Sequence, residues 1–333
     1  MNRMLKMFCG MAALALLSAC STSLSLIQPR NKEATELFAQ MDQAYNAGDC
    51  NLFHDLYAKF SAEKPSAKLR EQAYYYAGMC YEMRGGADNA VAVYKVAMEL
   101  YPKNPAFAYR LALIYSRSQF YEKSLPLFDI AISRHYQEKG ALAGAAMANA
   151  ALGRYPQAAK YYVRALSLSN DDSKNDAEDI RIIKELSLCL INSRRYEEAR
   201  EYIEKGHELD SMPVWHVLAA KSYSEEGDFK KASEEISKAI AEDNLREYRL
   251  SKAFYDYWAG ETKQAEAAAD MELAVNGRDY LAAFLKGMIL RSAGNKEKAD
   301  SYFRISACGE DFVGQMSRRM SSVPLPPNEE LCK

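Results

Sequence analysis

Apolar residues recur along this chain with the spacing of helices rather than of strands. They stand three or four positions apart over long stretches, and no segment keeps a period of two for long. The pattern also restarts every 33 to 41 residues, which predicts an all-α fold built from repeated helix pairs. The repeats start near Ala34, Glu71, Pro105, Lys139, Ile180, Pro213, Arg246 and Tyr280.

The second copy, a 34-residue window that begins at Glu71, is the most complete. Its positions 7, 8, 11, 20, 24, 27 and 32 hold Ala77, Gly78, Tyr81, Ala90, Tyr94, Ala97 and Pro102. The small residues let neighbouring helices approach closely, the tyrosines fill the space between two helices, and the proline ends the second helix. This pattern resembles the tetratricopeptide repeat, a helix–turn–helix unit. The resemblance implies a right-handed α-solenoid of about eight repeats over residues 34–313.

Two copies are degenerate. In the first repeat Gly48 and Pro65 fit the pattern, but Phe53 replaces the usual alanine of the second helix. In the seventh, Lys252 and Asp256 occupy positions that are usually apolar. Most of the other copies have a glycine in the turn, where we expect a positive φ that ends the first helix.

The end of the chain predicts a cap and a tail. A helix over 309–321 would present one apolar face and close the exposed end of the stack. Residues 322–333 contain the run Pro324-Leu325-Pro326-Pro327, which predicts an extended tail, with a short proline-rich ligand as the alternative. The apolar face of the cap consists of Phe312, Val313, Met316 and Met320.

The first residues read as a targeting segment. Basic Arg3 and Lys6 precede an uncharged apolar run that is too short to span a bilayer, so 1–19 fits a signal peptide. The run ends in Leu17-Ser18-Ala19-Cys20, which resembles a bacterial lipobox. The resemblance implies cleavage before Cys20, lipid modification of its thiol, and a short tether over 20–33. An ordinary secretory signal, cleaved after the small residues, is the alternative.

The residue after Cys20 bears on the compartment. It is Ser21 rather than an aspartate, and in bacterial lipoproteins of the enteric type this resemblance implies the outer membrane. We therefore expect a protein anchored in the outer membrane that faces the periplasm.

Charge excludes one class of partner. The chain has 43 basic and 45 acidic residues, and loss of Arg3 and Lys6 with the signal leaves 41 against 45, a net charge of −4. No Lys/Arg-rich patch is present, so nucleic acid is not expected as a partner.

The cysteines leave two interpretations open. Apart from Cys9 and Cys20, five remain, an odd number that leaves at least one thiol without an intramolecular partner. Their positions in the predicted helices are compatible with disulfides that join Cys50 to Cys80 and Cys308 to Cys332. The alternative is that all five are small buried apolar residues, as we expect for Cys189.

No catalytic, metal or cofactor site is expected. The four histidines do not pair with one another or with a cysteine at helical spacing, and no HExxH, CxxC, GxSxG or Walker-type motif is present. The acidic segment 171–176 lacks the glycine and final glutamate of a calcium loop.

The binding face follows from the repeat geometry. In the resemblance, the first helix of each repeat lines the concave side, and there we place a candidate partner-binding groove of tyrosine, methionine and arginine, types that interfaces favour. The alternative is that these side chains belong to the core between repeats. The groove candidates are Tyr75, Tyr76, Met79, Met83, Tyr109, Arg110, Leu113, Met147, Phe254 and Tyr257.

Two functions fit these expectations. The first is a non-enzymatic scaffold that binds a protein or peptide of the cell envelope, similar to tetratricopeptide lipoproteins that assist assembly of outer-membrane proteins, of secretins or pili, or of peptidoglycan enzymes. The second is a ligand-binding component of an uptake or polysaccharide system, with a small molecule held inside the solenoid near Gly144 and Met147.

Overall fold

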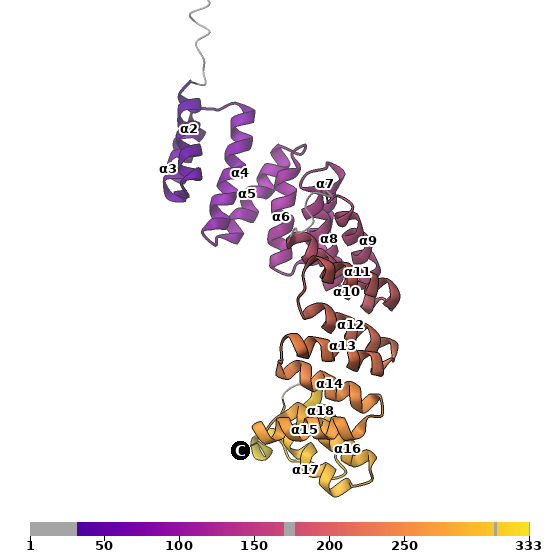
Figure 1. Cartoon of the computed structure of the whole chain (residues 1–333). Helices are drawn as coiled ribbons and strands as arrows, with labels where there is room; N and C mark the ends of the chain where they lie inside the picture. Colours follow the sequence, from indigo (N-terminus) through magenta and orange to yellow (C-terminus); the bar gives the residue numbers. More distant parts are fainter. Residues whose placement is uncertain (1–31, 170–176, 310–311, 333) are drawn as a thin grey trace, which may run out of the picture. The chain divides into compact units, whose positions relative to one another are not determined.

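The computed structural model describes residues 32–169, 177–309 and 312–332, which form an all-α solenoid of helix hairpins (Figure 1). The fold class predicted from the sequence is therefore confirmed. The signal peptide, Cys20, most of the expected tether and the acidic segment 171–176 lie outside the described residues. The chain divides into two compact units, Met1–Ala141 and Leu142–Lys333.

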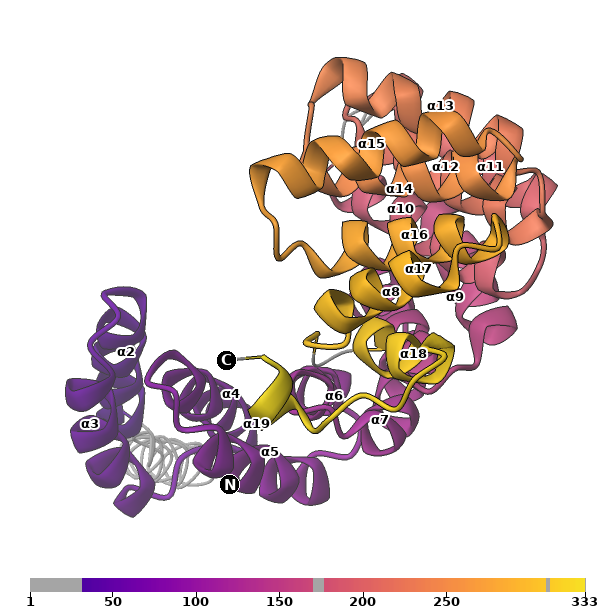
Figure 2. The same cartoon turned by 90° about the horizontal axis from the view of Figure 1, so that it is seen from below.

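The first unit is a stack of three complete hairpins that follow one another in chain order (Figure 2). Each second helix packs on its own first helix and on the first helix of the next hairpin. Helix α8 (Glu138–Ala151) begins in this unit and crosses the division. The hairpins are α2 (Lys32–Asn46) with α3 (Cys50–Ala62), α4 (Ala67–Met83) with α5 (Ala87–Leu100), and α6 (Pro105–Arg117) with α7 (Tyr121–Ser133).

The second unit continues the same construction and adds a cap. After α9 (Tyr155–Leu166) come four hairpins, and α18 (Phe312–Met320) then packs on α16 and α17 at the end of the stack. The hairpins are α10 (Ala177–Asn192) with α11 (Tyr196–Leu209), α12 (Val214–Glu226) with α13 (Phe229–Glu242), α14 (Arg246–Trp258) with α15 (Thr262–Val275), and α16 (Tyr280–Ser292) with α17 (Lys296–Ser306).

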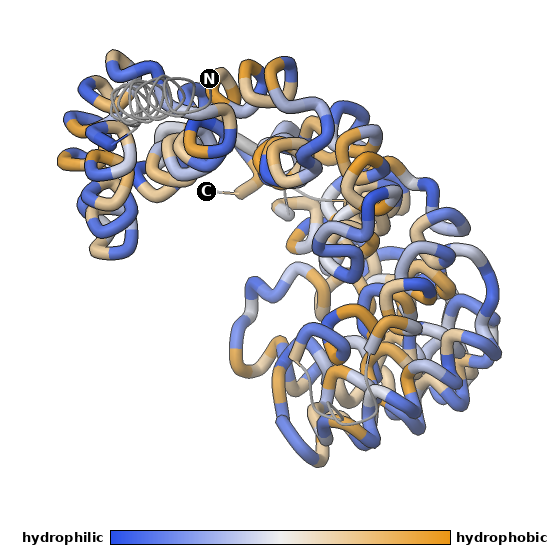
Figure 3. Tube along the Cα trace, turned by 90° about the horizontal axis from the view of Figure 1, so that it is seen from above, coloured by the Kyte–Doolittle hydropathy of each residue, from blue (hydrophilic) through white to orange (hydrophobic). Residues whose placement is uncertain are grey.

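Close contact between a small residue and a large ring holds each hairpin together. Tyr94 of α5 is fully buried, and a Cβ added to Gly78 of α4 would lie 2.2 Å from its Cε1 atom. The same arrangement returns in the last hairpin, where Gly287 faces the buried ring of Phe303. The helices carry both buried and exposed positions, and hydrophobic and hydrophilic segments alternate along the chain trace in Figure 3.

The turns within the hairpins contain a residue with positive φ, which is the expected glycine in most of them and another residue in two. The turn glycines adopt a left-handed backbone, for example Gly227 with φ 95° after α12. In the third and fifth repeats Gln119 (φ 63°) and Arg194 (φ 59°) take the same conformation without a glycine. The backbone requirement of the turn therefore holds even where the sequence departs from the pattern.

The degenerate repeats keep the fold by local compensation. Phe53 is fully buried in the core of the first repeat, where it replaces the small alanine with a large ring. Asp256 is also buried, and its carboxylate accepts hydrogen bonds from Lys252 at 2.7 Å and from the hydroxyl of Ser233. The usually apolar position therefore holds a charge because both partners are supplied nearby.

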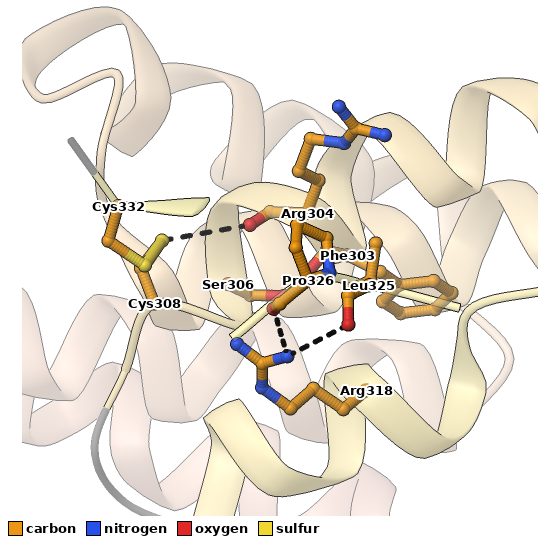
Figure 4. Close-up of a disulfide and its surroundings, with 8 residues drawn as sticks. All are labelled: Phe303, Arg304, Ser306, Cys308, Arg318, Leu325, Pro326 and Cys332. Atoms are coloured by element: carbon orange, nitrogen blue, oxygen red, sulfur yellow. Dashed lines mark hydrogen bonds between the residues drawn. A yellow bond between two sulfur atoms is a disulfide. The ribbon is translucent and has the colours of Figure 1, made fainter. Parts of the chain in front are cut away.

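Disulfides tie both ends of the described stack. Cys50, the first residue of α3, is joined to Cys80 of α4, so that the first hairpin is linked to the second. Cys308, after α17, is joined to Cys332 near the end of the chain (Figure 4). Cys189 is free and buried, as expected for a packing residue.

The tail differs from the expected extended segment. Arg318 of α18 donates hydrogen bonds from one guanidinium nitrogen to the carbonyl oxygens of Leu325 and Pro326, at 3.4 and 2.6 Å (Figure 4). A short helix, α19 (Asn328–Leu331), follows before Cys332. A cation on the cap and the disulfide between Cys308 and Cys332 therefore hold the tail in place. At the other end, α2 begins inside the expected tether, at Lys32.

None of the helices described here combines the length and the apolar composition that a membrane crossing requires.

The Gly78–Tyr94 contact can be tested by adding a methyl group. We expect Gly78→Ala to lower the free energy of unfolding by about 1–3 kcal/mol, because the ring behind it is fully buried and a crowded core relaxes poorly. Urea unfolding followed by circular dichroism measures the change. Gly277→Ala is the matched control, since its added Cβ would have its nearest neighbour at 3.9 Å. Equal stability of the two variants would contradict the proposed role of close packing.

Candidate functional site: a tyrosine groove in the first unit

A groove of about 470 Å³ runs along α4 and the start of α6 in the first unit. We call it the tyrosine groove, because three of its lining side chains are tyrosines. The α4 residues in the lining are spaced at i, i+3, i+4, i+7 and i+8, which places them on one face of the helix. The lining residues are Lys68, Glu71, Gln72, Tyr75, Tyr76, Asn104, Ala106 and Tyr136.

Tyr76 is fixed on two sides. Its ring stacks on Tyr45 of α2 with centroids 4.2 Å apart, and its hydroxyl donates to Asp42 Oδ1 at 2.8 Å. The same hydroxyl accepts a hydrogen bond from Gln72 Nε2 at 3.0 Å. Stacking and two hydrogen bonds together leave this ring in a single orientation at the groove wall.

Tyr75 and Tyr136 form the second part of the aromatic wall. Both line the groove, and Tyr136 meets Tyr109 edge-on at 5.8 Å between centroids. Burial, followed by the neighbouring hydroxyl of Tyr75, raises the pKa of Tyr136 to about 12. The Tyr136 phenol therefore remains a neutral hydrogen-bonding group at physiological pH.

The loop before α8 holds Tyr136 in place by an unusual backbone. The residues on either side, His135 (φ 52°) and Gln137 (φ 46°), both adopt the left-handed conformation, which side chains other than glycine rarely take. The Tyr136 amide donates to the carbonyl oxygen of Ala131 at 3.0 Å. Backbone strain of this kind persists where the surroundings enforce it, and it collects at functional positions.

The polar rim is also ordered. Asn104 caps α6 by accepting from the Ala106 amide, and its Nδ2 donates to Glu71 Oε1 at 2.8 Å. Apart from the tyrosines, Lys68 and Glu71 are the ionisable side chains of the lining, so the groove carries no net formal charge.

Arg110 supports the site from within the protein. Its side chain is 18% exposed and bonds to Glu82, whose carboxylate is 8% exposed, through Nε at 2.9 Å. The buried Tyr94 hydroxyl donates to the same carboxylate oxygen at 2.9 Å. Since Glu82 already neutralises it, Arg110 fastens α6 to α4 and does not offer a free charge to a partner.

The groove candidates named from the sequence therefore separate into groups. Tyr75 and Tyr76 line the tyrosine groove, and Tyr109 lies against Tyr136 beside it. Met79 and Leu113 are half-buried, whereas Met83 is 53% exposed. Of the candidates named from the sequence, Tyr75, Tyr76 and Tyr109 therefore lie close together.

Three candidates belong to the second unit and do not line this groove. Phe254 and Tyr257 are half-buried and pack against the hydrophobic core around Phe284, as the alternative interpretation expected. Met147 on α8 is 41% exposed, and the neighbouring Gly144 is buried.

Sequence reasoning missed the polar rim and Tyr136. Helical spacing on α4, counted back from Tyr75, leads to Gln72, Glu71 and Lys68. This part of the rim could therefore have been predicted from the sequence. Tyr136 could not, because its position depends on two left-handed residues that are not glycines.

Metal chemistry finds no support in the described ranges, where no three His, Cys, Asp or Glu side chains are placed to hold an ion. The described lining of the groove likewise consists of aromatic, amide and single charged groups, which suit binding rather than catalysis.

Comparison with known proteins agrees with this fold. Residues 109–173 match the tetratricopeptide repeat family. A tetratricopeptide repeat protein from Parabacteroides merdae is similar in structure, with a TM-score of 0.55 at 17% identity over 79% of this chain and 99% of that chain. The C-terminal part of a repeat protein from Cytophaga hutchinsonii gives a TM-score of 0.51 at 13% identity, over 86% of this chain and all of that one. No curated protein matches the sequence significantly.

At these identities the similarity concerns the fold, which is that of tetratricopeptide repeat proteins. Such solenoids present extended surfaces for protein and peptide partners. The tyrosine groove lies on the first unit of this solenoid.

The buried phenols predict a loss of stability at alkaline pH. Burial raises the pKa of Tyr57, like that of Tyr136, to about 12, whereas unfolded tyrosine ionises near pH 10. The unfolded chain therefore releases these protons first, so the stabilisation is complete below pH 10 and is lost as the pH rises toward 12. Helicity should fall as tyrosinate absorbance rises.

The substitution Tyr136→Phe removes one titrating group and should make this alkaline loss of stability shallower. If Tyr136→Phe unfolds at alkaline pH with the same profile as the original protein, ionisation of Tyr136 does not contribute to the loss of stability.

Proposed function

We propose that this chain is a scaffold of the bacterial envelope, anchored by lipid on Cys20, which holds a protein or peptide partner in the tyrosine groove. The observation that carries the binding part is the groove itself, an ordered aromatic surface with a polar rim on consecutive repeats. Its role would be to bring an envelope partner to an assembly of outer-membrane proteins, of a secretin or pilus, or of peptidoglycan enzymes.

The rigid groove favours capture of a partner. Tyr76 is stacked and doubly hydrogen-bonded, and Tyr136 packs edge-on against Tyr109, so little side-chain freedom remains to be lost on binding. Tyrosine supplies a large contact area with few rotatable bonds and recurs at the centres of interfaces. These properties support binding as the function of the groove.

The disulfides support an extracytoplasmic location. The pairs Cys50–Cys80 and Cys308–Cys332 sit at the two ends of the described stack, while buried Cys189 stays free. Disulfides persist in oxidising compartments such as the periplasm and are rare in the cytosol. They therefore agree with the export signal and the lipobox at the start of the sequence.

Lipid attachment can be measured directly. We expect cells fed a labelled fatty acid to label the full chain, and Cys20→Ser to abolish the label because the acceptor thiol is lost. Cys9→Ser is the matched control, since it removes a cysteine from the signal segment but not from the lipobox. Labelling that survives Cys20→Ser would exclude the proposed anchor.

Partner capture can be tested in living cells with a photo-crosslinking amino acid in place of Gln72, which is exposed and lines the groove. We expect a discrete protein adduct that Tyr75→Ala reduces at least about fivefold, because truncation of a central aromatic contact typically costs more than 1 kcal/mol. The same amino acid in place of Lys95, exposed on α5, is the control. No adduct at Gln72, or the same adduct at both positions, would overturn groove binding.

A further inference from the structure

The lining of the tyrosine groove restricts the way in which a partner can bind. Strand addition requires an exposed sheet edge, and residues 32–169, 177–309 and 312–332 contain no strand. An amphipathic helix lays a long apolar face into a hydrophobic groove, whereas half of this lining is polar or charged, namely Lys68, Glu71, Gln72 and Asn104. These two modes of recognition do not fit this surface.

Recognition of an acidic or phosphorylated motif does not fit either. That mode uses clusters of arginine, and no arginine is present in the lining. The nearby Arg110 is held by Glu82 at 2.8 Å, and the charge of Lys68 is balanced within the groove by Glu71. The groove therefore has no net charge that would attract a strongly charged partner.

Recognition of a polyproline II helix fits this lining better. This conformation makes no internal hydrogen bonds, so its carbonyl groups are free to accept, and its proline rings pack on flat aromatic faces. The wall of the groove contains three such rings, Tyr75, Tyr76 and Tyr136. Tyr76 is held by stacking on Tyr45 and Tyr136 by its edge-on contact with Tyr109.

The rim provides donors for the carbonyl groups. An amide nitrogen carries two N–H groups. Gln72 Nε2 uses one of them on the Tyr76 hydroxyl, and Asn104 Nδ2 uses one on Glu71, so each can offer the other. The ammonium group of Lys68 adds a third donor to the same rim. Aromatic faces and side-chain donors thus lie together along one face of α4 and the start of α6.

We propose that the tyrosine groove binds a proline-rich segment of its partner in the polyproline II conformation. This inference rests on the proposed function, because it specifies the chemistry of the partner that the groove captures. Such a ligand is already ordered before binding, and so is the groove, which keeps the entropic cost of association low on both sides.

The test measures fluorescence anisotropy of the purified full chain in detergent with a labelled polyproline peptide of about ten residues, which spans about 31 Å. A Gly–Ser peptide of equal length is the comparison. We expect the polyproline peptide to bind at least about tenfold more tightly. Equal affinity for the two peptides, or no binding of polyproline, would overturn the proposal.

Variants on α4 localise the effect. We expect Tyr75→Ala to weaken polyproline binding about tenfold, whereas Tyr75→Phe, which keeps the aromatic face, should stay within about threefold of the original affinity. Tyr74→Ala is the matched control, since Tyr74 is half-buried on the same helix but packs toward Tyr57 and Tyr101. Equal losses in Tyr74→Ala and Tyr75→Ala, or a tenfold loss in Tyr75→Phe, would contradict binding on the ring face.

Competition separates this inference from the proposed function. Excess polyproline should suppress the adduct formed at Gln72. An adduct that forms and withstands polyproline would leave partner binding in place and refute the proline-rich ligand, including the case in which the partner is a helix or a glycan. Absence of any adduct would count against the proposed function itself.

Discussion

A solenoid repeat can bury its helices only against its own partner helix and the neighbouring repeats, so the distance between adjacent helices decides whether the stack forms. In this protein that distance is set by small residues opposite large rings. Gly78 faces Tyr94, and Gly287 faces Phe303, with no room for a Cβ between them. The rings are fully buried as a result, and the turns, caps and disulfides act on a stack whose spacing is already defined.

The ends of such a stack are its weak points, because a terminal repeat has a neighbour on one side only. The described ends are reinforced by disulfide bonds. Cys50 and Cys80 are 30 residues apart in the sequence, and Cys308 and Cys332 are 24 apart. Closing loops of this size stabilises a fold by about 3 kcal/mol in the chain-entropy account. Helix α18 and the tail held by Arg318 add a noncovalent cover at the second end.

The fold was largely predictable from the sequence, because its determinants are local and periodic. The small-residue positions of the second repeat, the turn glycines and the aromatic positions each act within one hairpin or between adjacent ones. The tail was not predictable in the same way. Its course depends on Arg318, which reaches the carbonyl groups of Leu325 and Pro326, and a proline run alone predicts an extended segment.

The site was predictable only in part, for a related reason. Tyr75 and Tyr76 could be placed on the expected groove face from repeat geometry, but the same geometry also named Arg110 as a groove candidate. Its pairing with Glu82 depends on a buried carboxylate whose partners come from separate helices. Repeat periodicity describes the positions that the copies share, whereas each charge pair of this kind depends on residues that are particular to its own repeats.

The same reasoning distinguishes the shared positions of the repeats from the residues of the groove. Residues that recur in every repeat maintain the spacing of helices, and their chemistry is constrained by packing. The groove is built from exceptions to the repeat: a pair of tyrosines on α4, a cap at Asn104, and Tyr136 between two left-handed residues. Tyr75 and Tyr76 also pack against the cores of neighbouring repeats, and Asn104 joins α6 to α4, so the exceptions that form the groove take part in the stacking as well.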